Sequence, residues 1–503
     1  MDHLLVFIFL FTFTSIKCES ISPNVTTESN NTNSAIVEDK QTNETVTALP
    51  PVPKFPNVCN VCNCTGVIID CKGKNLTANL EDSQWPNTTI STISFEGNLL
   101  DHVKAFPKIV VKKLILKENK ITKLDRAAFK QLINLTELDL SHNELTSENL
   151  VPHAFEGKFS STAYEPLENL TTLSLSYNKL HTIHQDLFEH MSNLRILNLS
   201  HNLFTHIDVR TSLAISSIQR LEELDLSYCG LKEIENSQFH TTTYLKKLDL
   251  SGNQFTIPPA ALNGAVSLEY LYMDENPIKV IDHLNAFPSM SKLKELSLCC
   301  MPHLTTIEAN SFSGLEMLEH LRVSNCPKLE TIEESALTFQ MKETKEITWP
   351  PLKKLDLSDN ALEYLPQYLL VRWDLLEELD LTKNKWSCDC DNQYLIGELL
   401  PKYGKKLLGD NIGTLTCASP PEHAGTNLSS LSHRTLRCPD LYGARPERDA
   451  MILVGVMIGL MLAIPVCLAV FVFWRRGYFF CGTQGPASFS RAFYKRTAND
   501  DDM

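Results

Sequence analysis

The cysteines are the residues whose spacing in this chain points most directly to chemistry. The chain has 15 of them, and eight fall into two groups of four that flank a long middle region. The groups are Cys59, Cys62, Cys64 and Cys71, and Cys388, Cys390, Cys417 and Cys438. Clustered thiols of this kind form disulfides in an oxidising compartment or bind zinc. Neither group is accompanied by a matching histidine pair, so disulfides are the favoured interpretation, although spacing alone leaves three pairings open in each group.

Asparagines in Asn-x-Ser/Thr triplets form a second set of reactive positions, because each is an acceptor for an N-linked glycan in a secreted chain. The predicted glycosylation sites are Asn24, Asn30, Asn43, Asn75, Asn87, Asn134, Asn169, Asn198 and Asn427. Together with the cysteines, they favour a chain that folds outside the cytosol.

Patterns typical of enzymes do not occur in the sequence: there is no nucleophile elbow, no phosphate-binding loop and no metal-binding motif. The formal net charge of −14 argues against nucleic-acid binding, which needs clustered Lys and Arg. We therefore expect a protein that is not an enzyme, that has no catalytic residues, metal or cofactor, and that binds another protein.

The elements that must position these residues are repeats. From about residue 90 the pattern LxxLxLxxNxL recurs, for example as LTELDLSHNEL from Leu135 and LRILNLSHNLF from Leu194. The twelve first positions are Ile90, Val111, Leu135, Leu170, Leu194, Leu221, Leu245, Leu268, Leu293, Leu318, Leu352 and Leu376. Most are 21 to 27 residues apart, but the intervals after Leu135 and Leu318 are 35 and 34 residues. We interpret the two long intervals as surface insertions, with functional loops as the alternative.

The pattern predicts one short strand in each unit. In the LxL core the two leucines point inward and the residue between them points outward. Strands of successive units then stack in parallel into one sheet. The asparagine at the ninth position, such as Asn143 or Asn253, should lie inside the bend, where its amide can bond to backbone groups that would otherwise be unpaired. Later in many units a phenylalanine, such as Phe129 or Phe312, should form a second buried row.

These features resemble the extracellular leucine-rich repeat family, and the resemblance covers residues 59–438. It implies an α/β solenoid: a leucine-rich repeat horseshoe with a parallel concave sheet, closed at both ends by cysteine-rich caps. The resemblance also implies the disulfide pairs Cys59–Cys64, Cys62–Cys71, Cys388–Cys417 and Cys390–Cys438.

Four further cysteines lie within the repeats, at Cys229, Cys299, Cys300 and Cys326. Cys229 and Cys326 occupy the inward asparagine position, where a thiol can act as a small buried donor. We expect all four to be free structural thiols, with a Cys300–Cys326 bridge as the open alternative.

Two apolar segments predict a membrane protein. Leu4 to Phe13 is typical of the core of a signal peptide. Met451 to Trp474 contains no charge, is long enough to span a bilayer as a helix, and is followed by Arg475 and Arg476. The sequence therefore predicts a type I single-pass protein of the plasma membrane with its N-terminus outside the cell.

The predicted organisation has eight parts. They are a signal peptide (1–20), a disordered glycosylated segment (21–56), an N-terminal cysteine-rich cap (57–89), about twelve repeats (90–386), a C-terminal cysteine-rich cap (387–438), a juxtamembrane stalk (439–449), a transmembrane helix (450–474) and a short cytoplasmic tail (475–503). Gly455 and Gly459 form a GxxxG pattern that can support a homodimer. In the tail, Cys481 is a candidate palmitoylation site.

The outward positions of the predicted sheet give a candidate binding face. It comprises Glu137, Asp139, Glu223, Asp225, Asp249, Tyr270, Tyr272, Asp274, Asp356 and Asp380. The acidic residues either attract a basic partner or only keep the sheet solvated. Asn198 lies on the same face, so a glycan there would cover its middle and direct a partner to either side or to an edge. Asn134 and Asn169 precede their strands and should lie at the edge.

The sequence leads to one main functional hypothesis. We expect a cell-surface receptor or adhesion protein that recognises a protein ligand or an opposing cell-surface protein through its ectodomain. With a tail of 29 residues, too short for a folded signalling domain, it should signal through a co-receptor or only adhere or sequester ligand. The alternatives are a shed or matrix-type regulatory protein, and a co-receptor that modulates a secreted signal.

Overall fold

The computed structural model describes residues 57–159, 164–165, 167–341, 344–438 and 446–476. Several predicted features lie outside the described residues: the signal peptide, the segment 21–56 with Asn24, Asn30 and Asn43, most of the stalk, and the tail beyond Arg476 with Cys481.

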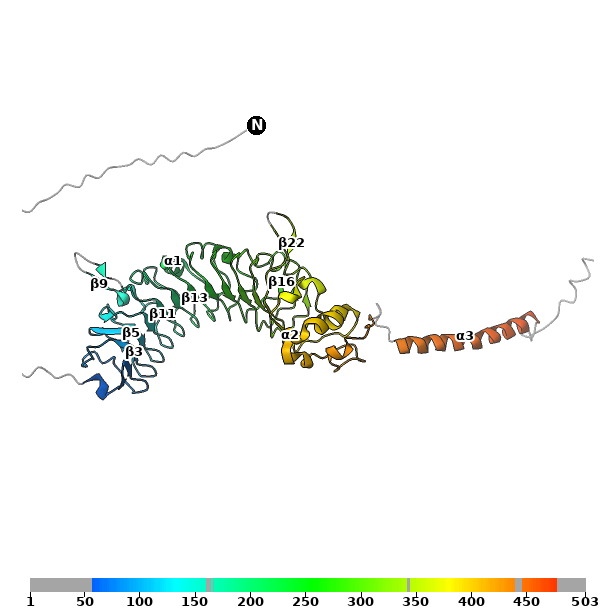
Figure 1. The fold of residues 1–503 in the computed structure, drawn as a ribbon, viewed down its shortest axis with the longest axis horizontal. Coiled ribbons are helices and arrows are strands. Elements are labelled where there is room, and N and C mark those ends of the chain that lie inside the picture. Colours follow the sequence, from blue (N-terminus) through cyan, green and yellow to red (C-terminus); the bar gives the residue numbers. More distant parts are fainter. Residues whose placement is uncertain (1–56, 160–163, 166, 342–343, 439–445, 477–503) are drawn as a thin grey trace, which may run out of the picture. The chain divides into compact units, whose positions relative to one another are not determined.

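One long parallel sheet organises the repeats (Figure 1). Each unit contributes the third to fifth residues of its pattern, and the strands follow one another in chain order. The twelve strands are β3 (Ile90–Ser94), β5 (Ile109–Ile115), β8 (Glu137–Asp139), β11 (Thr172–Ser174), β12 (Ile196–Asn198), β13 (Glu223–Asp225), β14 (Lys247–Asp249), β15 (Tyr270–Tyr272), β17 (Glu295–Ser297), β19 (His320–Arg322), β23 (Lys354–Asp356) and β24 (Glu378–Asp380). The predicted solenoid with a parallel sheet is confirmed.

Burial of the inward leucines stabilises the packing of each unit against the next. In the unit that begins at Leu221, the side chains of Leu221, Leu224 and Leu226 are at most 1% exposed. Leu224 pairs with Leu248 of the next strand, so the inward residues stay in register across the sheet. Burying each such side chain stabilises the fold by about 1.5–3 kcal/mol.

The phenylalanines form the second buried row that the sequence predicts. Phe129 and Phe155 stack with ring centroids 5.6 Å apart, and Phe287 and Phe312 stack at the same distance. Phe106 extends the first stack towards the N-terminus, 6.4 Å from Phe129. Aromatic rings thus fill the space opposite the sheet.

The ninth-position asparagines are buried and bonded to the backbone, as predicted. The Nδ2 group of Asn143 donates to the carbonyl oxygens of Leu116 and Leu140, both at 3.0 Å, and its Oδ1 accepts from the Ile121 N–H at 3.1 Å. Where Cys229 replaces the asparagine, its thiol donates to the Leu199 carbonyl oxygen at 3.3 Å. These side chains satisfy backbone groups that the turn leaves without a partner in its own unit.

Both ends of the sheet are closed by disulfide-linked caps. At the N-terminal end, β1 (Asn63–Thr65) pairs antiparallel with β2 (Ile68–Asp70), which extends the sheet beside β3. At the C-terminal end, a π-helix (Leu395–Gly404) and α2 (Lys405–Leu408) cover the last repeat. The disulfides are Cys59–Cys64, Cys62–Cys71, Cys388–Cys417 and Cys390–Cys438, the pairing that the family resemblance implied.

Two of the four cysteines within the repeats are free thiols. Cys229 and Cys326 are free and buried, as expected. The expectation of free thiols is wrong for Cys299 and Cys300, which form a disulfide with each other. The alternative Cys300–Cys326 bridge is absent, because the Cys326 thiol points inward and donates to the Leu298 carbonyl oxygen at 3.4 Å.

The two stretched units each form a hairpin outside the main sheet. The first hairpin pairs β9 (Lys158–Phe159) with β10 (Tyr164–Glu165), and the second pairs β21 (Phe339–Gln340) with β22 (Ile347–Thr348). In other units, the chain between one strand of the main sheet and the next forms two-residue strands or single turns of helix. These strands are β4 (His102–Val103), β6 (Lys123–Leu124), β7 (Leu132–Ile133), β16 (Val280–Ile281), β18 (Thr306–Ile307) and β20 (Thr331–Ile332).

Two further helices, α1 (Val209–Ser217) and α3 (Pro446–Arg475), are longer than a single turn. The helix α1 lies in the 27-residue unit and is capped by Asp208, whose side chain accepts from the Thr211 N–H. The helix α3 contains Ala450–Arg475, a stretch long and apolar enough to cross a membrane and the only such helix within the described residues. Its position agrees with the predicted transmembrane helix.

Candidate functional site

The concave sheet presents two rows of outward side chains, one from the third and one from the fifth position of each unit. The alternation of a strand buries the fourth residue, such as Leu138 or Leu379, and leaves its two neighbours partly exposed. Because neighbouring strands are in register, equivalent outward residues face one another across the sheet. The predicted face residues lie on these rows, except Asp274, which follows β15 by two residues.

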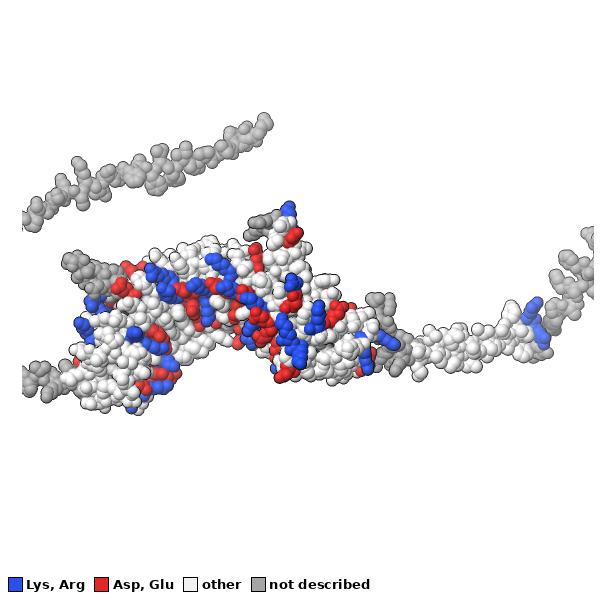
Figure 2. All heavy atoms as spheres, in the orientation of Figure 1, with Lys and Arg blue, Asp and Glu red and all other residues white. Residues whose placement is uncertain are grey.

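Basic residues on neighbouring strands pair with three of the eight predicted acidic residues, Glu137, Glu223 and Asp356. Lys113 pairs with Glu137, and Lys247 Nζ lies 3.9 Å from Glu223 Oε2. Nearer the C-terminal end, Arg322 Nε lies 3.4 Å from Asp356 Oδ2. On the face shown in Figure 2, acidic and basic side chains are accordingly interspersed along the solenoid. The third-position row therefore alternates in charge, whereas the fifth-position aspartates other than Asp356 have no ion-pair partner among the described residues.

The fifth-position aspartates also close the turn that follows their strand. In each case Oδ1 accepts a hydrogen bond from the backbone N–H two residues further along, at 2.9–3.0 Å. The pairs are Asp139 with Ser141, Asp225 with Ser227, Asp249 with Ser251, Asp356 with Ser358 and Asp380 with Thr382. These carboxylates therefore have a structural role whether or not they also contact a partner.

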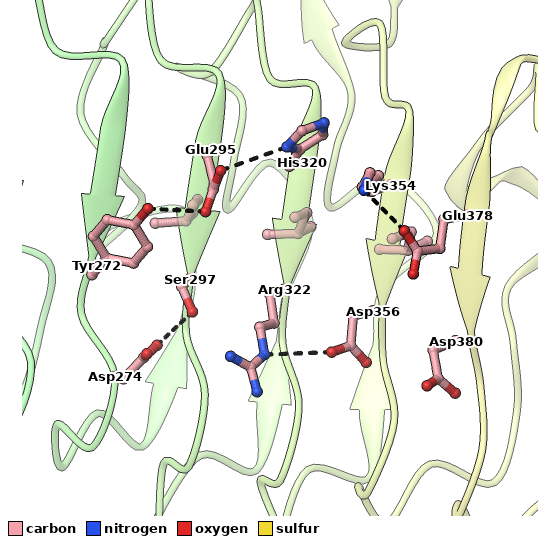
Figure 3. A pocket seen from close by; sticks show the side chains of 13 residues that line it. Tyr272, Asp274, Glu295, Ser297, His320, Arg322, Lys354, Asp356, Glu378 and Asp380 are labelled. Atoms are coloured by element: carbon pink, nitrogen blue, oxygen red, sulfur yellow. Dashed lines mark hydrogen bonds and ion pairs between the residues drawn. The ribbon is translucent and has the colours of Figure 1, made fainter. Parts of the chain in front are cut away.

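A hollow of the concave face lies across β15, β17, β19, β23 and β24 and has a volume of about 440 Å³ (Figure 3). Its lining includes Tyr272, Asp274, Glu295, Ser297, His320, Arg322, Lys354, Asp356, Glu378 and Asp380. Tyr272 donates its hydroxyl to Glu295 at 3.1 Å, and Lys354 pairs with Glu378 at 3.0 Å. Among the described residues, Asp380 has no ion-pair partner. We call this hollow the concave pocket.

Burial and neighbouring charges shift several pKa values on this face. Burial raises the pKa of Asp249, and the negative charges of Asp225 and Asp274 add to that effect. Burial and the Glu295 carboxylate raise the pKa of Tyr272 to about 12, so this phenol stays protonated and keeps its hydrogen bond to Glu295. Lys247 Nζ lies 5.7 Å from the centre of the Tyr272 ring, which places a cation near the aromatic face.

Asn198 points outward from β12, between Ser174 and Asp225 of the neighbouring strands, as the sequence predicts. It is half-buried, and its Oδ1 accepts from the N–H and the hydroxyl of Ser200 at 2.9 and 2.8 Å. The described sequons at Asn75, Asn87, Asn134 and Asn169 are exposed. The side chain of Asn427 is tied into the C-terminal cap, where its Nδ2 donates to the Gly413 carbonyl oxygen at 2.7 Å.

A column of stacked rings runs beside the sheet and was not predicted from the sequence. Tyr177 lies between His142 and His201 with centroid separations of 3.9 Å, and Tyr228 follows His201 at 4.4 Å. All four residues hold the eighth position of consecutive units, where the backbone φ is 52° or 53°. The shared repeat position was the signal that would have revealed the stack.

The described residues contain no group of three or more His, Cys, Asp or Glu side chains placed to hold a metal ion. The chemistry available to the concave face is therefore that of its hydrogen-bonding, charged and aromatic side chains, which suits the recognition of polar surfaces.

Comparison with known protein families shows which family the repeats resemble. The Leucine rich repeat family matches residues 110–158, 168–222 and 219–278, and the BspA type Leucine rich repeat region (6 copies) matches residues 256–366. These matches lie within the part of the chain that forms the parallel sheet.

Three relatives from Mus musculus illustrate the likeness. The chain is 28% identical to CD180 antigen, over 49% of this chain and 35% of that protein. It is 29% identical to podocan-like protein 1, over 47% and 39%, and 25% identical to leucine-rich repeat transmembrane protein FLRT2, over 46% and 37%. The matches thus span less than two thirds of the length of each relative.

Proposed function

Because the chain belongs to the leucine-rich repeat family, we propose that it is a cell-surface protein that binds another protein through its concave sheet and has no catalytic activity. The observation that carries this proposal is the concave pocket, in which charged, hydroxyl and aromatic side chains from five adjacent strands line one hollow. Rigid parallel strands hold these groups in place, so little conformational entropy is lost when a partner binds.

The membrane location is proposed from separate features. The apolar stretch of α3 is followed by Arg475 and Arg476, which is typical of the cytoplasmic side of a span. The disulfides and sequons lie on the N-terminal side of α3, as expected for an extracellular region. We therefore propose a type I single-pass protein of the plasma membrane. A glycan released by endoglycosidase from the Asn134 or Asn198 peptide would support this orientation, and an unmodified chain would contradict it.

Two matched charge reversals test the proposed binding surface. Glu378 pairs with Lys354 inside the concave pocket, and Glu144 pairs with Lys179 outside the strands, with separations of 3.0 and 2.8 Å. Cells that display the full chain are probed with a library of secreted and surface ectodomains to find a ligand. We expect Glu378→Lys to weaken binding of that ligand by at least about tenfold and Glu144→Lys to change it by less than about twofold. Equal binding by both variants would exclude the concave pocket.

A shed or matrix-type protein, or a co-receptor, is the alternative. The Arg445 and Arg448 positions between the C-terminal cap and the span are potential protease sites. Recovery of most of the ectodomain from the culture medium, with little at the cell surface, would favour shedding. Clustering of cells that express the protein would favour adhesion over a co-receptor role.

A further inference from the structure

Each of the two inserted hairpins creates a hollow beside the residues that lead into the next strands. The first hollow lies between Lys158 of β9 and the residues that precede β8 and β11. The second lies between β22 and the residues that precede β23 and β24, and its volume is about 390 Å³. The first hollow lies before the strand of the unit that carries its hairpin and the next strand, whereas the second lies before the two strands that follow its hairpin.

The two hollows differ in chemistry. The first is lined by Lys130, Glu168 and the two sequon residues Asn134 and Asn169, so glycans there would cover it. The second is mostly apolar and is lined by Ile347, Thr348, Trp349, Pro350, Pro351, Leu352, Leu370, Val371, Arg372 and Leu375. No Asn-x-Ser/Thr triplet occurs between residues 199 and 426. The apolar hollow is thus in a part of the chain without glycan acceptors.

Large apolar side chains at the second hollow are unusually exposed. The exposed fractions are 67% for Ile347, 51% for Val371 and 53% for Leu375. The hairpin is held in place by the pairing of β21 with β22 and by Trp349, whose Nε1 donates to the Tyr368 carbonyl oxygen at 3.2 Å. An exposed apolar patch on a fixed backbone marks a surface that another molecule covers.

We propose that a second copy of this chain covers the hollow. The patch contains both a projecting side chain, Ile347 on β22, and an apolar hollow directly beside it. A two-fold axis through the patch places Ile347 of each copy in the hollow of the other, which is the self-complementary arrangement that an isologous dimer requires. The apolar lining also matches homodimer interfaces, which are more apolar than transient ones.

Two features of the chain near the membrane also favour a second copy. Only residues 439–445 separate the described end of the C-terminal cap from α3, and seven extended residues reach no more than about 30 Å. The last repeats of neighbouring copies are thereby held at similar heights above one membrane. In α3, Gly455 and Gly459 are four residues apart, a spacing that allows two helices to approach closely. This part of the inference rests on the proposed membrane anchorage, but not on a ligand at the concave sheet.

Cysteine cross-linking between two differently tagged full-length chains tests the arrangement. One chain carries Ile347→Cys and the other Val371→Cys, both in a Cys467→Ala background that removes the exposed thiol of α3. On co-expression and mild oxidation at the cell surface, we expect a disulfide-linked species that contains both tags. The control pairs Ile347→Cys with Leu203→Cys, because Leu203 is 62% exposed but lies in a distant unit. The control pair should give no such species.

A second variant keeps the inference testable if the cysteine chains fold poorly. Ile347→Asp places a charge on the projecting residue and is expected to lower the dimer fraction, measured by chemical cross-linking in intact cells, by at least about tenfold. Unchanged dimer with Ile347→Asp, or cross-linking of Ile347→Cys to a different protein, would overturn the proposal. Binding of the concave-face ligand is measured in parallel and should survive Ile347→Asp. Carbonate extraction of the same membranes tests the anchorage, so a failure of the proposed localisation is recognised separately.

Discussion

Replacement of Asn253 gives a quantitative test of how the units are held together. The Nδ2 group of Asn253 donates to the carbonyl oxygens of Leu226 and Leu250, each at 2.9 Å, and its Oδ1 accepts from the N–H groups of Cys229 and Leu231 at 3.1 and 3.0 Å. The side chain is only 4% exposed. Asn253→Ala therefore leaves three backbone groups without a partner, the Leu226 carbonyl and the Cys229 and Leu231 N–H groups, while the Leu250 carbonyl still accepts from Asn276 at 3.0 Å.

The expected loss in the free energy of unfolding follows from the number of backbone groups left without a hydrogen-bond partner. Each buried polar group left without a partner costs about 1–3 kcal/mol. If water entering the space left by the side chain satisfies one of the three groups, Asn253→Ala should lower the free energy of unfolding by about 2–6 kcal/mol. Asn253→Cys should lower it by about 2 kcal/mol, because a thiol keeps one donor. The Cys229 thiol already acts in this way in the preceding unit.

The assay is urea unfolding of the purified full-length protein in detergent, followed by tryptophan fluorescence. Asn236→Ala is the control, because Asn236 is exposed and its replacement should change the free energy of unfolding by less than about 0.5 kcal/mol. A cost below about 1 kcal/mol for Asn253→Ala, or equal costs for the alanine and cysteine variants, would refute the assigned role of the asparagine amide.

Two further predictions concern the concave face and the thiols. The pKa of Asp249 is raised, so the native state binds its proton more tightly and loses stability as the pH rises through that pKa. Asp249→Asn, which keeps the oxygen that accepts from Ser251, should raise stability by about 0.5–1 kcal/mol at pH 7.5, and the gain should vanish near pH 3.5. Asp356→Asn should instead lower stability at pH 7.5, because it breaks the pair with Arg322; melting curves at both pH values check the contrast. Burial raises the pKa of Cys229 to about 12 and that of Cys326 to about 11, so iodoacetamide at pH 8 should label them only after unfolding, and labelling of the native protein at either would contradict their burial.

The strands and the buried asparagines could be predicted because their positions are encoded locally. Each unit repeats the spacing of the inward leucines. A shift of a strand by one residue would turn all of its inward leucines outward, so the strand positions are strongly specified. All twelve strands accordingly contain the third to fifth residues of their units, from Ile90 to Asp380. The hairpins at β9–β10 and β21–β22 could not be predicted in this way, because the inserted residues leave the repeat and their partners are set by local pairing alone.

The ion pairs between adjacent strands were not predicted, although the sequence contained the signal for them. Lys113 and Glu137 hold the third position of adjacent units, as do Glu223 and Lys247, and in-register parallel strands bring such residues together. Aligning the units by position would have revealed these pairs. The Cys299–Cys300 disulfide is different, because it joins two neighbouring residues within one turn, and no other unit has a pair of cysteines at these positions.

The stacked rings also set a mechanical property of the solenoid. A column with centroids 3.9–4.4 Å apart leaves little freedom to open or close the angle between the four units that carry it. The column stops at Gly252, where an added Cβ would lie 2.2 Å from Tyr228 Cδ1, so the Tyr228 ring rests directly on the backbone of the next unit. We expect this stretch to keep a constant curvature, so that any bending of the arc under load or on ligand capture is concentrated in the repeats on either side.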